Sequence, residues 1–231
     1  MQTMEYGKAF TYAPQEANWI VKLLIAAFVP LVPIVGSIVS LGYTVEITRR
    51  VIKGESVLLP EWSDFGGLLK TGFQAFVVAL VYALPLLVIA ICGVIPVAAL
   101  AAQEDETLTQ IALVLNFCMS CVLILLALVV AIILPAAFGK LADTGEMSAA
   151  LRVGEIFKLV RAKPGVYVIV ALLSILGASV LSSIGTILCG VGAFVGVAYA
   201  GLANAHLHGQ AYRVASAEGG MTPMTPDAPA A

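Results

Sequence analysis

Long apolar stretches separated by short polar segments make up most of this chain. The apolar positions, with the prolines and glycines between them, predict helices at about residues 14–30, 33–52, 60–98, 108–139, 164–182 and 186–212. An α-helix needs about 20 apolar residues to cross the ~30 Å hydrocarbon core of a bilayer. The pattern therefore predicts an all-α fold, a polytopic membrane helical bundle with six transmembrane helices arranged as three helical hairpins.

Two further segments have different patterns. Within 147–162, Leu151, Ile156 and Leu159 share one face of a helix, and charged residues occupy the others. This periodicity predicts an in-plane amphipathic helix at the membrane surface. Residues 214–231 are rich in Ala, Thr, Pro and Gly, which predicts a disordered cytoplasmic tail. Residues 1–213 then form a single integral membrane domain.

The first predicted hairpin leaves the number of spans open. Pro30 and Pro33 interrupt the apolar sequence of 14–50, and proline breaks or bends a helix. We favour a hairpin that crosses the membrane twice. The alternatives are a single crossing, which gives five spans in total, and a re-entrant hairpin that enters and leaves on one side.

The basic residues predict the orientation. Lysine and arginine gather in the segments 49–70 and 139–163 and at Arg213, whereas 101–110 and 183–185 contain none. Loops rich in lysine and arginine stay on the cytoplasmic side of a membrane. We therefore expect a multi-pass protein with both termini in the cytoplasm.

Composition supports lipid as the solvent of this chain. Apolar residues make up 61% of it and charged residues 11%, with a mean hydropathy of +1.02; soluble domains carry about 25% charged residues. The net charge of −2, with no basic patch, excludes nucleic acid as a partner. The expected partners are the lipid bilayer and a membrane protein or a second copy of the chain.

Lys22 and Glu46 are the ionisable residues of greatest interest, because they fall within apolar sequence. Charges at membrane depth are costly and often functional. In a bent hairpin the two side chains lie in the same half of the membrane, which makes them a candidate intramembrane polar pair. The alternative is that Lys22 extends to the headgroups and Glu46 is interfacial.

The remaining candidate residues have structural roles. Two arginines end the second helix and two acids follow in the next loop, so we predict an inner-loop structural clamp of Arg49, Arg50, Glu61 and Asp64. Tryptophan is enriched at the level of the lipid headgroups. We expect Trp19 and Trp62 to be interface anchors.

Two motifs resemble metal or redox sites but lack the rest of such a site. Cys118 and Cys121 form one C-x-x-C, with no second C-x-x-C in the sequence and no histidine directly after it. His206 and His208 are two residues apart, so on a helix they point about 200° apart and do not bind one ion. We therefore predict no metal, no cofactor and no enzymatic activity.

Two segments resemble a known family. They are GYTVEITRRVIKGESVLLPEW at 42–62 and NAHLHGQAYR at 204–213. Both are similar to the uncharacterised prokaryotic integral membrane family called domain of unknown function 4013, and the resemblance covers about residues 5–213. Leu-Pro-Glu-Trp at 59–62 is the most specific piece, and Ser63-Asp64 departs from the two acids that the family pattern has after it. The resemblance implies a prokaryotic plasma-membrane protein and no site residues.

These observations favour a non-enzymatic accessory subunit or scaffold of a membrane assembly. Small residues on the predicted helices provide packing surfaces for other helices. The alternative is a small transporter or lipid-handling protein, because helices broken by proline often line transport sites. A transporter predicts charged groups in a water-filled cavity, and a scaffold predicts a packed interior.

Overall fold

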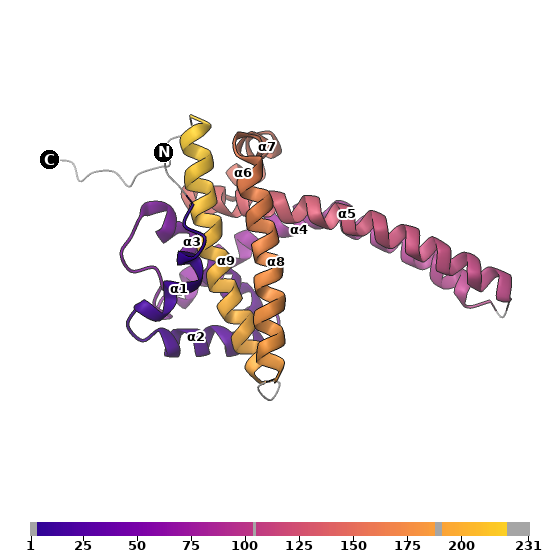
Figure 1. Ribbon diagram of the computed structural model, residues 1–231, viewed down its shortest axis with the longest axis horizontal. Coiled ribbons are helices and arrows are strands. Elements are labelled where there is room, and N and C mark those ends of the chain that lie inside the picture. The colour runs from indigo at the N-terminus through magenta and orange to yellow at the C-terminus, as the bar shows by residue number, and fades with distance from the viewer. Residues whose placement is uncertain (1–3, 104, 188–190, 221–231) are drawn as a thin grey trace. The chain divides into compact units, whose positions relative to one another are not determined.

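The computed structural model describes residues 4–103, 105–187 and 191–220, and all regular elements in these residues are helices. Figure 1 labels these helices along the chain. The elements are α1 (Lys8–Thr11), η1 (Ala13–Gln15), α2 (Trp19–Phe28), η2 (Val29–Leu31), α3 (Val35–Lys53), α4 (Phe65–Ala101), α5 (Glu106–Thr144), α6 (Met147–Ala150), α7 (Val153–Ala162), α8 (Pro164–Ile187) and α9 (Val191–Glu218).

Three of these helices are long and apolar enough to cross a membrane. They are α4 over Phe65–Leu100, α5 and α8, and Trp19–Leu31 is a shorter apolar helix. Length and composition therefore indicate insertion into a membrane. The ten residues of α2 extend only about 15 Å, too short to cross the core alone.

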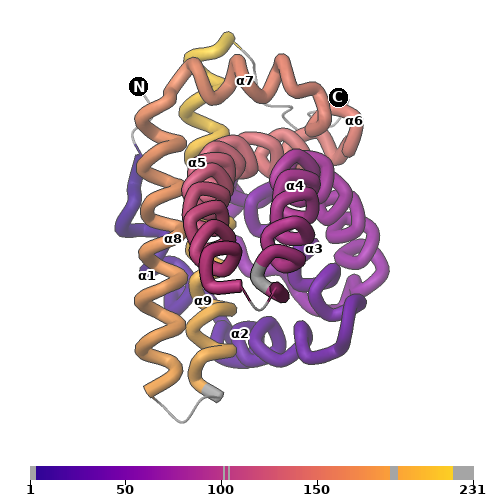
Figure 2. Tube along the Cα trace, turned by 90° about the vertical axis from the view of Figure 1, so that its right-hand side faces the viewer, coloured from indigo at the N-terminus to yellow at the C-terminus, as the bar shows by residue number. Residues whose placement is uncertain are grey.

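The chain divides into two compact units, one of 1–78 with 132–231 and one of 79–131. In the first unit α8 and α9 run antiparallel and side by side (Figures 1 and 2), and α3 packs against α9. The helices approach closely because a Cβ added at Gly185 would overlap the backbone of Gly192, and one at Gly196 the carbonyl of Leu181. Small residues at such crossings are typical of helices that pack in lipid.

α3 and α4 cross even more closely. A Cβ built on Gly42 would overlap the carbonyl of Leu68 and lie 2.9 Å from the amide nitrogen of Gly72. The relation is reciprocal, because a Cβ on Gly72 would overlap the carbonyl of Ile38 and lie 2.9 Å from the Gly42 nitrogen. Only glycine at both positions allows the two backbones to touch.

Local sequence fixes the loop between these two helices. Gly54 ends α3 with φ of 70°, in the left-handed conformation that glycine adopts without strain. Asp64 begins α4, and its carboxylate accepts a hydrogen bond of 2.9 Å from the amide of Gly67. Residues 55–63 connect these caps and pack on a core that includes Tyr43, Ile47 and Leu202.

The second unit consists of the parts of α4 and α5 in 79–131. Of its described side chains and glycines, only Gly93 and Ala112 are buried. Gly93 lies beneath the side chain of Met119 and brings the two helices together. The 23 helical residues from 79 and the 26 up to 131 contain only Glu106 as a charged residue. At 1.5 Å per residue each is about as long as a bilayer core is thick.

Several boundaries differ from the sequence prediction. α4 begins at Phe65 rather than 60, since Asp64 caps it, and α8 continues through the predicted turn at 183–185. The predicted tail begins within α9, which extends to Glu218 because Ala215 and Ser216 are buried. Residues 221–231 lie outside the described residues.

The predicted amphipathic helix at 147–162 consists of two helices, α6 and α7. Ile156 and Leu159 of α7 are fully buried, and α7 packs on α8 and α9. Its inner face therefore contacts protein rather than lipid. Glu155 lies between Lys140 at 3.4 Å and Arg152 at 3.1 Å. The hydrogen bond from Arg152 lowers the pKa of the Glu155 carboxyl.

Candidate functional site

Lys22 occupies a buried position on α2. Its exposed fraction is 6%, and its ammonium donates a hydrogen bond of 2.9 Å to the carbonyl of Leu59. The same nitrogen lies 2.6 Å from Glu61, whose side chain is 74% exposed. A buried lysine is stable only when it is paired and hydrogen-bonded. Lys22 therefore fastens the loop between α3 and α4 to α2.

Two further side chains, Glu16 and Tyr43, hold the same loop. The Glu16 carboxylate accepts hydrogen bonds from the amides of Leu58, at 2.6 Å, and Leu59, at 3.0 Å. The Tyr43 hydroxyl donates to the Pro60 carbonyl at 3.3 Å. The Tyr43 ring also stacks on the ring of Trp62, with 4.2 Å between the ring centroids and 5° between the ring planes.

We call this arrangement the loop latch. It comprises the loop residues Leu58, Leu59, Pro60, Glu61 and Trp62 with the three residues that hold them, Glu16, Lys22 and Tyr43. Leu59 is completely buried at its centre. Every residue of the Leu-Pro-Glu-Trp segment thus makes a specific contact with the helices behind it.

The structure does not form the predicted pair of Lys22 and Glu46. Glu46 instead lies 2.7 Å from Arg49 and 3.5 Å from Arg50. The reason is helix geometry, because residues three and four positions apart on α3 are neighbours. Lys22, on a different helix, meets the loop instead.

The predicted clamp also has different partners. Arg49 donates from Nε to the carbonyl of Ala142 at 3.0 Å, so it joins α3 to the end of α5. Arg50 lies 3.8 Å from Glu55. Of the two predicted acids, Glu61 pairs with the lysine of the latch and Asp64 caps α4.

The two tryptophans lie against the protein core. Trp62 is partly buried by its stacking on Tyr43. Trp19, at the start of α2, is also partly buried and packs against the same hydrophobic cluster. Their role as membrane-interface anchors stays a prediction.

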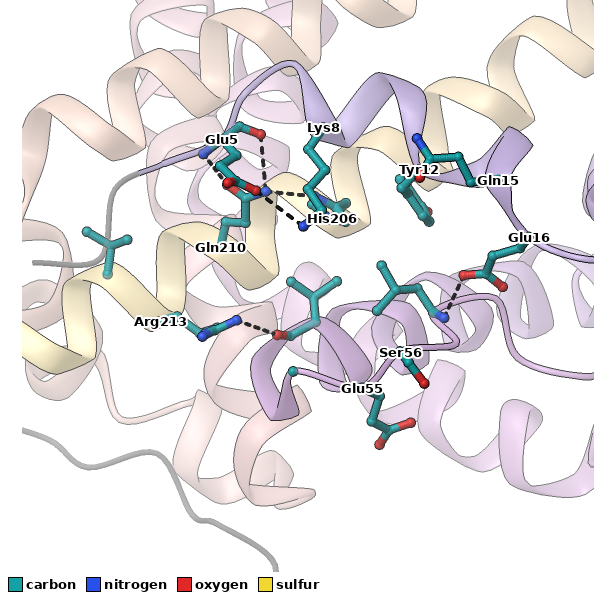
Figure 3. Close-up of a pocket in the computed structure, with 14 residues that line it drawn as sticks. Glu5, Lys8, Tyr12, Gln15, Glu16, Glu55, Ser56, His206, Gln210 and Arg213 are labelled. Carbon is teal, nitrogen blue, oxygen red and sulfur yellow. Dashed lines mark hydrogen bonds and ion pairs between the residues drawn. The ribbon is translucent and has the colours of Figure 1, made fainter.

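A polar pocket of about 660 Å³ lies beside the latch. The segment of α1 and η1 forms one wall, the end of α3 with residues 54–58 forms another, and the 206–214 stretch of α9 forms the third. Figure 3 shows Lys8 and Tyr12 on the side of the pocket opposite Ser56 and Glu55. The charged lining residues are Glu5, Lys8, Glu16, Glu55 and Arg213.

His206 and Gln210 form the inner wall of this pocket. The His206 ring stacks on Tyr12 at 4.7 Å between centroids. Gln210 accepts a 2.8 Å hydrogen bond from the Glu5 amide and donates to the Glu5 carbonyl at 3.2 Å. Its second N–H points to His206 Nδ1 at 3.0 Å, which assigns the ring proton to Nε2.

Tyr12 connects the pocket to the helices behind it. Its hydroxyl donates to the carbonyl of Leu202 at 3.1 Å. Burial raises the pKa of the Tyr12 hydroxyl well above its usual value, and the nearby Tyr43 and Glu16 raise it further. The phenol therefore stays a neutral hydrogen-bond donor. The sequence does not predict roles for Tyr12, Glu16 and Tyr43, because no local pattern distinguishes them from residues that only pack in the core.

The other sequence motifs do not assemble a site. His208 contacts Phe138, with 6.3 Å between ring centroids, while His206 faces the opposite side of α9. Cys118 and Cys121 are exposed free thiols. Among the described residues, no three metal-ligating side chains come together.

An apolar groove of about 550 Å³ lies between α2, α3 and α9. Small side chains form much of its surface. They include Ala26, Ala27, Ser37, Ala193, Ala198 and Gly201.

The family model described as "Protein of unknown function (DUF4013)" matches residues 25–191, more than half of the chain. The chain belongs to this family. No curated protein and no solved structure matches the chain.

In this DUF4013 protein, the matched range and the candidate site overlap in part. The matched range includes Tyr43 and the loop residues of the latch, together with the wall of the pocket formed by residues 51–58. Glu16 and Lys22, and the pocket walls from α1 and α9, lie outside it. The latch therefore joins a loop inside the matched range to two residues that precede this range, Glu16 and Lys22.

Proposed function

We propose that this DUF4013 protein is a non-enzymatic component of a membrane assembly, either an accessory subunit or a scaffold. The observation that carries the proposal is the loop latch. Lys22, the candidate intramembrane charge, is bound to Leu59 and Glu61, and Glu46 is paired with Arg49. Charges that hold the fold together fit a structural component better than a transport route.

The hairpin 79–131 is the surface that we assign to assembly. Its two helices expose large apolar side chains on most of their surface, with Phe117 at 71% and Leu113 at 66%. Apolar helices of this kind are covered by lipid or by other helices. Because the hairpin buries so little of itself, it offers apolar side chains of both its helices to a partner helix.

We infer a topology in which α4, α5, α8 and α9 cross a prokaryotic plasma membrane. The 28 residues of α9 extend about 42 Å and pack along α8. The short α2 and its neighbour α3 then form the re-entrant first hairpin. Four crossings leave both termini on one side, and the lysines and arginines near the helix ends assign that side to the cytoplasm.

The proposal is tested by native mass spectrometry of the protein extracted in a mild detergent. We expect a complex of fixed stoichiometry, with a second membrane protein or a second copy of the chain. Replacing Ile95, Leu113 and Phe117 with alanine lowers the assembled fraction. The matched control replaces Leu172, Leu176 and Val180 of α8, which are similarly exposed, and keeps the assembly.

Two results would count against the proposal. A protein that is monomeric under all mild extraction conditions contradicts the role in an assembly. An assembly that survives the hairpin substitutions at the same stoichiometry contradicts the surface that we assign. A monomer that retains lipid favours the second candidate, a lipid-handling protein or small transporter, for which the apolar groove is the supporting observation.

A further inference from the structure

The polar pocket contains both acidic and basic groups, and most of them are already paired. Lys8 lies 3.3 Å from Glu5, and both Leu58 and Leu59 donate to the Glu16 carboxylate. These contacts account for one of the two bases and two of the three acids. Arg213 and Glu55 are the charged lining residues that remain.

The Arg213 guanidinium retains most of its hydrogen-bonding capacity. It donates one bond of 3.3 Å, from Nη1 to the carbonyl of Val51. Within the described part of the chain, its other N–H groups have no acceptor. A guanidinium presents donors in a planar fork that matches a phosphate group, so this wall of the pocket suits an anion.

The Glu55 carboxylate also retains most of its capacity to accept hydrogen bonds. It is the acceptor in one ion pair, with Arg50, whose distance of 3.8 Å is near the limit for such a contact. Figure 3 shows Glu55 on the wall opposite Lys8, with its carboxylate directed away from the Lys8 ammonium, so the two groups are not paired with each other. A carboxylate that is this weakly paired can accept hydrogen bonds from an ammonium group.

The inner wall adds neutral groups that suit the same ligand. With His206 Nδ1 facing the Gln210 amide, the imidazole carries its proton on Nε2. No described group accepts a hydrogen bond from that N–H. The hydroxyl of Ser56 also lines the pocket. Both groups can donate to phosphate oxygens.

We propose that this pocket binds a zwitterionic ligand with one phosphate and one primary ammonium group, the chemistry of phosphoethanolamine. Arg213 and His206 hold the phosphate, and Glu55 holds the ammonium. The volume of about 660 Å³ lies within the usual range of small-molecule sites. A purely anionic ligand is disfavoured, since the five charged lining residues sum to −1. The ligand is either a lipid headgroup or a free metabolite.

The test measures binding to the purified full chain in detergent by isothermal titration calorimetry. The probes are dihexanoyl phosphatidylethanolamine, dihexanoyl phosphatidylglycerol and free phosphoethanolamine. We expect the ethanolamine lipid to bind and the glycerol lipid, which lacks the ammonium, to bind about tenfold more weakly. A ten-fold preference of the protein for the ethanolamine lipid over free phosphoethanolamine identifies a membrane lipid as the source. Equal affinities identify the soluble compound.

Glu55→Gln removes the charge that faces the ammonium, and we expect it to weaken ethanolamine-lipid binding about fivefold to tenfold, as for one charge-assisted hydrogen bond. Glu146→Gln is the matched control, an exposed acid outside the pocket. Arg213→Lys, which keeps the charge but loses the fork, weakens binding of both phosphoethanolamine probes. Equal binding of the two lipids, or equal affinity of the two glutamine variants, would overturn the proposal. Neither result bears on the role in a membrane assembly.

Discussion

Replacing Gly42 with alanine is expected to lower the free energy of unfolding by about 3 kcal/mol, the upper range for overpacking a closely packed contact. The added methyl group overlaps the carbonyl of Leu68 and lies 2.9 Å from the Gly72 nitrogen. Backbone atoms cannot rotate away as a side chain can, so the two helices must separate. Thermal unfolding in detergent should show a midpoint lowered by roughly 6–12 °C.

Gly66→Ala is the matched control on the same helix pair. A Cβ at Gly66, in the first turn of α4, meets no atom within 4 Å. Alanine there restricts the unfolded chain and is expected to be neutral or stabilising by up to about 1 kcal/mol. Gly72→Ala should be as destabilising as Gly42→Ala because the contact is reciprocal. If Gly42→Ala unfolds at the same temperature as Gly66→Ala, the close crossing of α3 and α4 is wrong.

Replacing Lys22 with methionine is expected to destabilise the protein by roughly 2–3 kcal/mol. The substitution leaves the buried carbonyl of Leu59 without its charged donor, and a hydrogen bond to a charged group contributes about 1.5–3 kcal/mol. The lost ion pair with Glu61 adds less than about 1 kcal/mol, because that carboxylate is mostly in water. Thermal or denaturant unfolding measures the loss.

Two variants separate the hydrogen bond from the charge. Glu61→Gln keeps an oxygen that accepts from Lys22, so it should cost less than about 1 kcal/mol. Lys158→Met removes an exposed lysine of α7 and should change stability by less than about 0.5 kcal/mol. A Lys22→Met protein as stable as wild type would place the ammonium in water, which is what a transport route requires.

The long helices were predictable from the sequence because their apolar runs exceed any reasonable length for a loop or strand. α4, α5 and α8 therefore overlap the predicted segments, with ends that differ by up to five residues. The short α2 was not, since the pattern predicts one helix over residues 14–30 and only the structure shows that ten of these residues form the α-helix. A hydropathy pattern gives the length of an apolar segment and not the depth at which it lies.

The partners of the charged residues could not be obtained from the sequence. Lys22 and Glu46 are both in apolar sequence, and a bent hairpin brings such residues near each other. Whether they meet depends on the register of α2 against the loop at 58–62, which local pattern does not encode. Glu46 had nearer partners on its own helix, and that preference follows from i,i+3 and i,i+4 spacing.

The polar pocket depends on contacts between the two ends of the chain. Gln210 binds the backbone of Glu5, which is 205 residues away, and Tyr12 binds that of Leu202, 190 residues away. Pairings at this separation arise only when the whole unit is folded. Of these four residues, only Gln210 lies in a segment that resembles the family, 204–213.

Amide hydrogen exchange at the loop latch tests the central claim most directly: that the Leu-Pro-Glu-Trp segment and the charges around it fasten the fold. In the native protein in detergent, the amides of Leu58 and Leu59 should exchange at least about 100-fold more slowly than that of Val57, because both donate to Glu16. Glu16→Gln and Lys22→Met should each reduce this protection. Exchange of Leu58 and Leu59 as fast as that of Val57 in the wild-type protein would contradict the latch.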